Sequence, residues 1–254
     1  MNLNKCFIIA ELSANHGGEL DIALETIRAA KRAGADAIKI QTYTADTITL
    51  NSNKDCFKIN QGTHWDGQYL YDLYKEASLP WEWHFKIFEV AKEEGLVCFS
   101  SPFDNSAVDL LEELNTPIYK IASFEITDIP LIEYAASKGK PMIISTGIAE
   151  IADIELAIEA CKKVGNNDIT ILKCTSAYPA DPKEANLLTI PDIKSRFGVK
   201  VGLSDHTLGI EGPVVASVLG ATVIEKHFIL DKSIGGPDAH FSLDEKEFTE
   251  MVNA

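Results

Sequence analysis

Two lysines lie inside apolar stretches of the sequence, where a positive charge is costly unless it meets an anion. Lys39 stands in AIKIQ and Lys120 in IYKIA, and both segments alternate in the way that buried strands do. In the first segment the two isoleucines share one face, so Lys39 and Gln41 share the other and point inward. Two such cations predict a cradle for a phosphate or carboxylate group. The alternative is that they pair with buried glutamates, Glu11 or Glu125.

Two histidines suggest a metal ion at the same place. His206 follows the apolar run VGLSD, and His227 ends the run VIEKH. Neighbouring strands lie about 4.8 Å apart, so imidazoles from two adjacent strands can reach one ion. A pair of neutral imidazoles binds divalent transition metals and leaves positions for water and substrate. The pattern leaves open that each histidine is an ordinary hydrogen-bonding residue.

The segment GGPDAHFSLD follows the second of these histidines. Its Gly-Gly-Pro start predicts a tight turn. Such a turn can present Asp238 over the site, but an ordinary turn explains the same residues equally well.

The elements that must position these residues are eight short, β-branched runs separated by helical patterns. Helices are indicated at 21–33, 80–95 and 153–163 by apolar spacing and by terminal proline or glycine. Repeated strand–helix units of this number predict a (β/α)8 TIM barrel over residues 1–254. An open doubly wound sheet is disfavoured because no glycine-rich turn follows the first run. The expected strands are 7–12, 37–41, 97–101, 118–122, 142–146, 169–174, 201–204 and 223–228.

Polar residues gather where these strands end, which is where barrel enzymes carry their active sites. Hydroxyl side chains follow several strands and complete the expected anion cradle. A connection of nearly forty residues, 42–79, is rich in aromatic residues, which predicts an ordered, functional loop. The strand-end residues are Glu11, Lys39, Gln41, Ser100, Ser101, Lys120, Ser123, Ser145, Thr146, Thr175, Ser176, Ser204, Asp205, His206, Glu225, Lys226 and His227.

Composition narrows the class of protein. The 254 residues carry a formal net charge of −15, which disfavours binding to nucleic acid or to anionic lipid. Five scattered cysteines without a CxxC pair indicate reduced thiols. No apolar run approaches the roughly 20 residues that span a bilayer. We therefore expect a soluble, cytoplasmic protein.

Taken together, the motifs resemble the sialic acid synthase family. The resemblance covers essentially the whole chain, and three segments, 63–84, 173–179 and 235–243, are most similar to the branch that makes pseudaminic acid. It implies condensation of phosphoenolpyruvate with an acetamido sugar aldehyde, with release of phosphate. The motifs, in order, are IAELSANHGG, AIKIQTY, SSPFD, YKIAS, IISTG, KCTSAYP, GLSDHT and EKHF.

The resemblance also implies roles for individual residues. Glu11 would act at the reacting carbon. His206 and His227 would bind a catalytic divalent ion, with manganese expected and magnesium or cobalt as alternatives. The sugar would face Gln41, Glu125, Tyr178 and Asp238, and phosphoenolpyruvate would be held by Lys39, Ser101, Lys120, Ser123, Ser145, Ser204 and, where the family usually has asparagine, Ser176.

One feature departs from the family pattern. Family members carry a small antifreeze-like domain after the barrel, and this sequence ends before one. We therefore expect weak activity and a weakened form of the family homodimer. Alternative functions are an N-acetylneuraminate or legionaminate synthase, a non-catalytic barrel that binds phosphoenolpyruvate and sugar, or a lyase that forms a Schiff base at Lys120 or Lys39.

Overall fold

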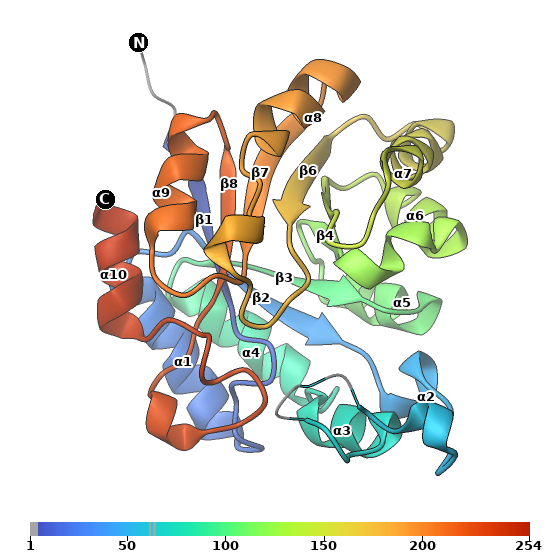
Figure 1. The fold of residues 1–254 in the computed structure, drawn as a ribbon. Helices are drawn as coiled ribbons and strands as arrows, with labels where there is room; N and C mark the ends of the chain where they lie inside the picture. The colour runs from blue at the N-terminus through green and yellow to red at the C-terminus, as the bar shows by residue number, and fades with distance from the viewer. Residues whose placement is uncertain (1–4, 61, 63–64) are drawn as a thin grey trace.

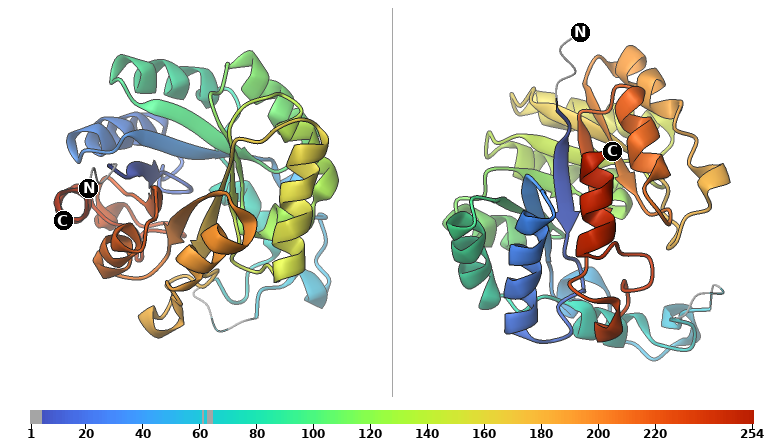
Figure 2. Two further views of the ribbon diagram at one scale, coloured as in Figure 1. Left: turned by 90° about the horizontal axis from the view of Figure 1, so that it is seen from above. Right: turned by 90° about the vertical axis from the view of Figure 1, so that its left-hand side faces the viewer.

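Eight parallel strands form a closed barrel in the computed structural model, which describes residues 5–60, 62 and 65–254. Neighbouring strands pair in sequence order, and β1 pairs with β8 to close the ring (Figures 1 and 2). Each expected strand end falls within one residue of the observed end, which confirms the predicted TIM barrel. The strands are β1 (Phe7–Glu11), β2 (Ala37–Thr42), β3 (Val97–Pro102), β4 (Tyr119–Ile121), β5 (Met142–Ser145), β6 (Ile169–Cys174), β7 (Lys200–Asp205) and β8 (Val223–His227).

Helices surround the strands, as the left view of Figure 2 shows. Local sequence explains where they start: Asp104 caps α5 and Asp244 caps α10 through their side chains. Helix α4 begins at Trp83 rather than at the expected Pro80, because residues 80–82 form a separate hydrogen-bonded turn. The helices of the ring are α1 (Leu20–Arg32), α4 (Trp83–Glu93), α5 (Asn105–Glu113), α6 (Ile129–Ala136), α7 (Ile151–Lys163), α8 (Thr189–Phe197), α9 (Glu211–Val218) and α10 (Glu245–Asn253).

Strand alternation separates two layers of packing. Ile38 and Ile40 point outward into the core under the helices, as predicted. Gly202 faces inward, where a Cβ atom would lie 2.3 Å from the Val223 carbonyl oxygen, so β7 needs glycine there. The inward side chains form an apolar floor beneath the strand ends: Ile9, Ala37, Phe99, Ile143, Leu172 and Val223.

The two longest connections, β2–α4 and β8–α10, lie at the carboxyl end of the strands, at the bottom of Figure 1. The first contains two helices that the sequence did not predict, α2 (Ala45–Ile48) and α3 (Leu70–Ala77), and a 3-10 turn, Asp55–Phe57. The second contains the 3-10 turn Lys232–Ile234. Residues 61, 63 and 64 of the first connection lie outside the described part. Among the helices of the described ranges, none is long and apolar enough to cross a membrane.

Candidate active site

Strand register brings a glutamate, a lysine and a histidine side by side at the carboxyl ends of the barrel strands. Glu11 is paired in register with Lys39 on one side and with His227 on the other. Lys39 Nζ lies 2.7 Å from Glu11 Oε2, and 4% and 1% of the two side chains are exposed. Lys39 therefore points into the barrel as predicted and also has the glutamate partner that the alternative foresaw. Burial raises the pKa of Glu11, although Lys39 opposes the rise.

Lys120 lacks such a partner. Its Nζ donates to Ser145 Oγ at 2.6 Å and to the Ile121 carbonyl at 3.0 Å, and no carboxylate of a described residue lies within ion-pair distance. Burial lowers the pKa of Lys120, although Glu225 opposes the shift. The alternative pairing with Glu125 is not found among the ion pairs of the described residues. A buried ammonium bonded only to neutral oxygens has the charge and the donor capacity to bind an anion.

Glu125 is itself an unusual group. Its Oε2 is buried and accepts no hydrogen bond from the described residues, and burial raises the pKa of this carboxyl to about 7. It lies just after β4, in the 3-10 turn Ser123–Thr127.

The hydroxyl groups expected in the cradle do converge. Ser101 Oγ accepts from Lys39, and Ser204 Oγ donates to Glu225 Oε1 at 2.9 Å. Ser123 Oγ accepts from the amide of Gly147 at 3.0 Å. A Cβ atom on Gly147 would lie 1.9 Å from Ser176 Oγ and 2.7 Å from Ser123 Oγ, so only glycine lets these two hydroxyls come together.

The histidines form a pair above this cradle. The rings of His206 and His227 lie 5.3 Å apart between centroids. His206 Nδ1 donates to the Thr175 carbonyl at 2.9 Å, which leaves Nε2 as a free lone pair. Burial lowers the pKa of His227 well below its usual value, so this ring is neutral. His227 thus presents the neutral form that binds a cation, and the hydrogen bond to Thr175 occupies Nδ1 of His206 and leaves its Nε2 as the nitrogen that could bind one.

The donor set fits a metal ion held by two protein ligands. In residues 5–60, 62 and 65–254, no group of three or more His, Cys, Asp or Glu side chains is arranged to hold a metal. Asp238 Oδ2 lies 3.8 Å from His227 Nδ1, beyond hydrogen-bond distance, and accepts from the amide of Ala14. An ion at the two imidazoles would therefore keep several positions for water and substrate.

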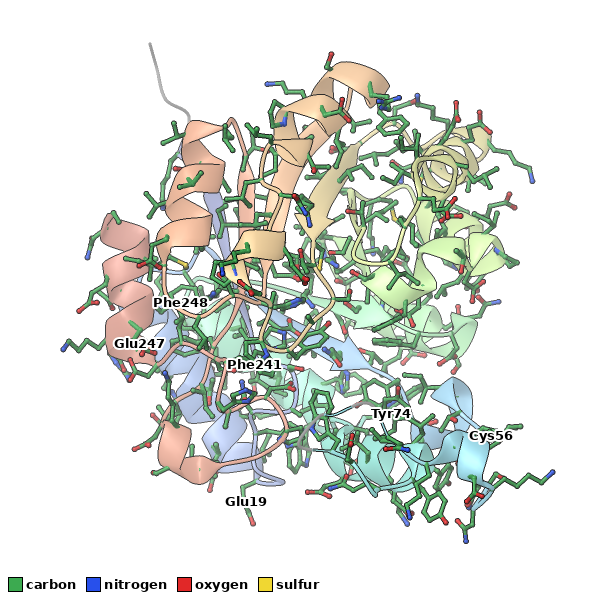
Figure 3. The ribbon with its side chains drawn as sticks, viewed as in Figure 1. Glu19, Cys56, Tyr74, Phe241, Glu247 and Phe248 are labelled. Atoms are coloured by element: carbon green, nitrogen blue, oxygen red, sulfur yellow. The ribbon has the colours of Figure 1, made fainter. Side chains whose placement is uncertain are left out.

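Aromatic rings wall the space beside the histidines. Tyr178 lies 4.3 Å from His206 between ring centroids, and Phe241 lies 4.9 Å from His227. The ring of Trp65, from the β2–α4 connection, lies 6.5 Å from the ring of Tyr178, measured between centroids. Figure 3 shows where Phe241 and Tyr74, an aromatic residue of α3, lie in the molecule. Gln41 extends the polar side of this space by donating to Glu11 Oε1 at 3.0 Å.

Two residues of the site received no role from the sequence. Glu225 is buried. Its Oε1 accepts a hydrogen bond from Ser204 Oγ, and its Oε2 lies 3.8 Å from Lys39 Nζ. Cys174 Sγ lies 3.8 Å from His206 Nδ1. Burial opposes charge on both partners, but their attraction raises the pKa of His206 and lowers the pKa of Cys174 to about 7. Alternation was the available signal, since Glu225 stands two residues before His227 on the same strand.

Comparison with known proteins agrees with the motifs. The model of the NeuB family matches residues 26–254. The pseudaminic acid synthase of Helicobacter pylori is 54% identical over 97% of this chain and 72% of its own length. The pseudaminic acid synthase of Campylobacter jejuni (strain 81-176) is 53% identical over 98% of this chain and 73% of its own length.

A solved structure extends the likeness to three dimensions. The N-acetylneuraminic acid synthetase of Leptospira borgpetersenii superposes with a TM-score of 0.89 at 35% identity, over 99% of this chain and 82% of that one. The expected resemblance to sialic acid synthases is confirmed by sequence and by fold, and the chain belongs to the NeuB family.

Proposed function

We propose that the chain condenses phosphoenolpyruvate with 2,4-diacetamido-2,4,6-trideoxy-L-altrose and water to give pseudaminate and phosphate. The observation that carries the proposal is Lys120, a buried cation without an anion, beneath the imidazole pair. The choice of sugar is supported by identity, which is 54% to a pseudaminic acid synthase and 35% to an N-acetylneuraminic acid synthetase.

Phosphoenolpyruvate carries a carboxylate and a phosphate, and the cradle offers a matching pair of cations. Lys120 would bind one anionic group, assisted by Ser123 and Ser145. Lys39 would bind the other with Ser101, while it stays bonded to Glu11. Charge-assisted hydrogen bonds of this kind fix both ends of the substrate and leave its C3 free to react.

A divalent ion, with manganese expected, would be held by His206 and His227 and would supply Lewis acidity toward the aldehyde oxygen of the sugar. Burial keeps the imidazole of His227 neutral, and the Thr175 carbonyl accepts from Nδ1 of His206, which leaves Nε2 of that ring for the ion. Tyr178, Gln41, Glu125 and Asp238 would orient the sugar along the wall beside the histidines.

The proposed reaction then has three bond changes. C3 of phosphoenolpyruvate attacks the aldehyde carbon, water adds to C2, and the resulting tetrahedral centre loses phosphate by C–O cleavage. Glu11 would carry a proton at this centre, because burial raises the pKa of its carboxyl and Lys39 and Gln41 hold both of its oxygens in place.

Phosphate release from phosphoenolpyruvate tests the proposal. We expect release with the altrose substrate and far less with N-acetylmannosamine or with 2,4-diacetamido-2,4,6-trideoxymannose, and we expect a chelator to stop it. Equal turnover of all three hexoses would contradict the choice of sugar. Binding of phosphoenolpyruvate without release for any hexose would favour the non-catalytic alternative, and a borohydride-trapped adduct at a lysine would favour the Schiff-base lyase.

Substitution of either histidine tests the metal position. His206→Ala and His227→Ala should each abolish metal-dependent turnover and weaken manganese binding measured by calorimetry. His240→Ala, outside the imidazole pair, is the matched control and should keep both. We also propose the cytoplasmic location and the homodimer expected for the family, which cell fractionation and gel filtration with light scattering test.

A further inference from the structure

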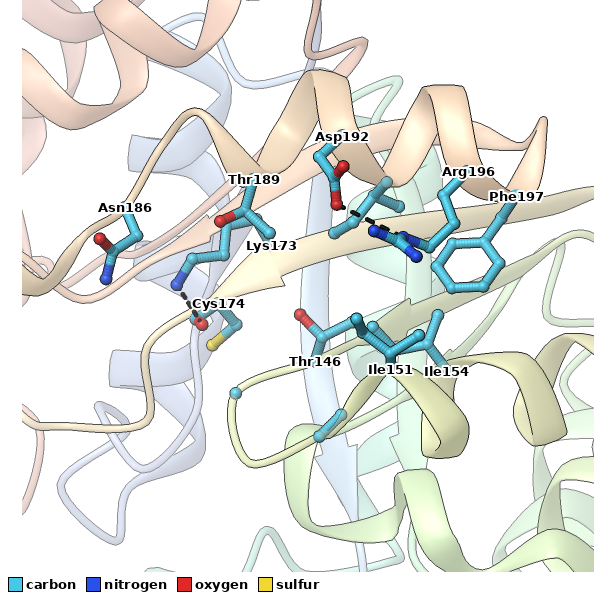
Figure 4. Close-up of a pocket in the computed structure, with 13 residues that line it drawn as sticks. Thr146, Ile151, Ile154, Lys173, Cys174, Asn186, Thr189, Asp192, Arg196 and Phe197 are labelled. Atoms are coloured by element: carbon cyan, nitrogen blue, oxygen red, sulfur yellow. Dashed lines mark hydrogen bonds and ion pairs between the residues drawn. The ribbon is translucent and has the colours of Figure 1, made fainter.

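A cavity lies on the outer side of the barrel wall, between α7 and α8. It has a volume of about 390 Å³, within the range of small-molecule sites. Its inner end is formed by the ends of β5 and β6, and residues of the two helices face each other across it (Figure 4). The imidazole pair, at the ends of β7 and β8, and the anion cradle lie on the inner side of the barrel. Gly147 and Cys174 line the cavity and also lie beside the cradle serines and His206.

The cavity contains a lysine without an anionic partner. Lys173 Nζ donates to the Cys174 carbonyl at 2.6 Å and to Thr175 Oγ1 at 2.8 Å. None of the ion pairs found among the described residues includes it. An ammonium has three protons to donate, so one remains for a ligand. Burial lowers the pKa of Lys173, which an anion at this position would reverse.

The remaining lining defines the body of the ligand. Ile151 and Ile154 of α7 lie across the cavity from Phe197 of α8 (Figure 4). With Ile193, which also lines the cavity, they make an apolar slot beside the lysine. Arg196 pairs at 3.5 Å with Asp192 and lines the outer part of the slot. An occupant therefore needs an anionic head for Lys173 and a flat or branched apolar body.

We propose that this cavity binds a small organic carboxylate with an apolar body, and that its occupation lowers the activity of the barrel. The physical link is the segment 173–175. On its outer side it carries the cavity's lysine, and on its inner side the Thr175 carbonyl holds His206 while Cys174 Sγ contacts the same ring. A carboxylate that draws the ammonium away from Thr175 loosens the residue that orients His206. This regulatory effect rests on the proposed function, whereas the binding does not.

Binding is tested on the whole chain by calorimetry with benzoate, and acetate serves as a probe that has the charge without the apolar body. Benzoate should bind and acetate should bind at least tenfold more weakly. Lys173→Met should weaken benzoate binding at least tenfold, and so should Ile151→Trp, which fills the slot from a half-exposed position and keeps the lysine. Lys194→Met, an exposed lysine of α8 outside the lining, is the matched control and should change nothing.

The active site must be excluded as the place of binding. Lys120→Met should leave benzoate affinity unchanged, and saturating phosphoenolpyruvate should fail to displace benzoate. No binding of benzoate, or binding lost in Lys120→Met and kept in Lys173→Met, would overturn the proposed site.

The regulatory effect is measured by phosphate release. Benzoate should lower the rate at least twofold in the unmodified chain and not in Ile151→Trp. Binding without any change of rate would overturn the regulatory part. Failure of the proposed function itself would show as no phosphate release with any hexose and would leave the calorimetric result standing.

Discussion

Two fully buried lysines on the two faces of the barrel wall have opposite surroundings. Lys226, on the outward face of β8, donates to the carboxylate of Asp205 and to the Thr207 carbonyl. Lys120, on the inward face of β4, donates only to a hydroxyl and a carbonyl. The outer charge is neutralised within the protein and ties β7 to β8. The inner charge lacks an anion and is therefore available to a substrate.

This difference locates function within a single strand. Glu225, Lys226 and His227 are consecutive in β8. Lys226 pairs with Asp205 on the outer face of the wall, whereas Glu225 and His227 face the candidate site. The outer ion pair also joins the strand ends that carry the two histidines, so the stability of the wall and the geometry of the imidazole pair are linked.

The largest expected effect is the loss of stability when the outer pair is broken. Lys226→Met leaves the Asp205 carboxylate buried without a counter-charge and should lower the free energy of unfolding by about 3–5 kcal/mol, measured by urea denaturation. The double variant Asp205→Asn/Lys226→Met removes both charges and should recover part of this loss. If Lys226→Met were as stable as the unmodified chain, the claim that the outer ion pair stabilises the wall would be contradicted.

The inner lysine should give the reverse pattern. Lys120→Met should weaken phosphoenolpyruvate binding about 100-fold, near 2.7 kcal/mol, because a charge-assisted contact to the substrate is lost. Its free energy of unfolding should stay the same or rise, because no buried anion loses its partner. Calorimetry and urea denaturation measure the two effects, with exposed Lys162→Met as the matched control. Unchanged phosphoenolpyruvate affinity would contradict the cradle.

Glu125 tests the inner face through pH. Burial raises the pKa of its carboxyl from 4.5 to about 7, so folding disfavours the charged form. The stability of the ligand-free protein should therefore fall as pH rises from about 4.5 to about 7. Glu125→Gln should remove this fall and be more stable than the unmodified chain by about 2–3 kcal/mol at pH 8, with no difference at pH 4. Parallel pH profiles for the two proteins, measured by urea denaturation, would refute the prediction.

The smallest effect concerns the hydroxyls of the cradle. Gly147→Ala should push Ser176 and Ser123 aside and raise the KM for phosphoenolpyruvate about fivefold, near 1 kcal/mol, with little loss of stability because a hydroxyl can rotate away. The double variant Gly147→Ala/Ser176→Ala removes the nearest oxygen and should restore part of the affinity. Steady-state kinetics measures both, and an unchanged KM in the single variant would argue against a role for these serines in binding.

The sequence predicted the inner face better than the outer one. The alternation within AIKIQ and IYKIA was enough to predict that Lys39 and Lys120 point inward, because alternate residues of a strand lie on opposite faces. The pairing of Lys226 with Asp205 depends on which strands are neighbours and on what the helices cover, and neither is a local property of the chain. For the same reason the sequence did not predict the role of Glu225, because its partners Lys39 and Ser204 lie on β2 and β7. Helices α2 and α3 were missed because both are short and lie in a segment without clear periodicity.

Closure of the ring between β1 and β8 has a consequence for biosynthesis. Glu11 emerges from the ribosome more than two hundred residues before His227, the residue with which it is paired in register. Glu11 and His227, the proposed proton carrier and a proposed metal ligand, therefore meet only when the last strand docks against the first. A chain that ends before β8 therefore lacks both the neighbour of Glu11 and the second of the two proposed metal ligands.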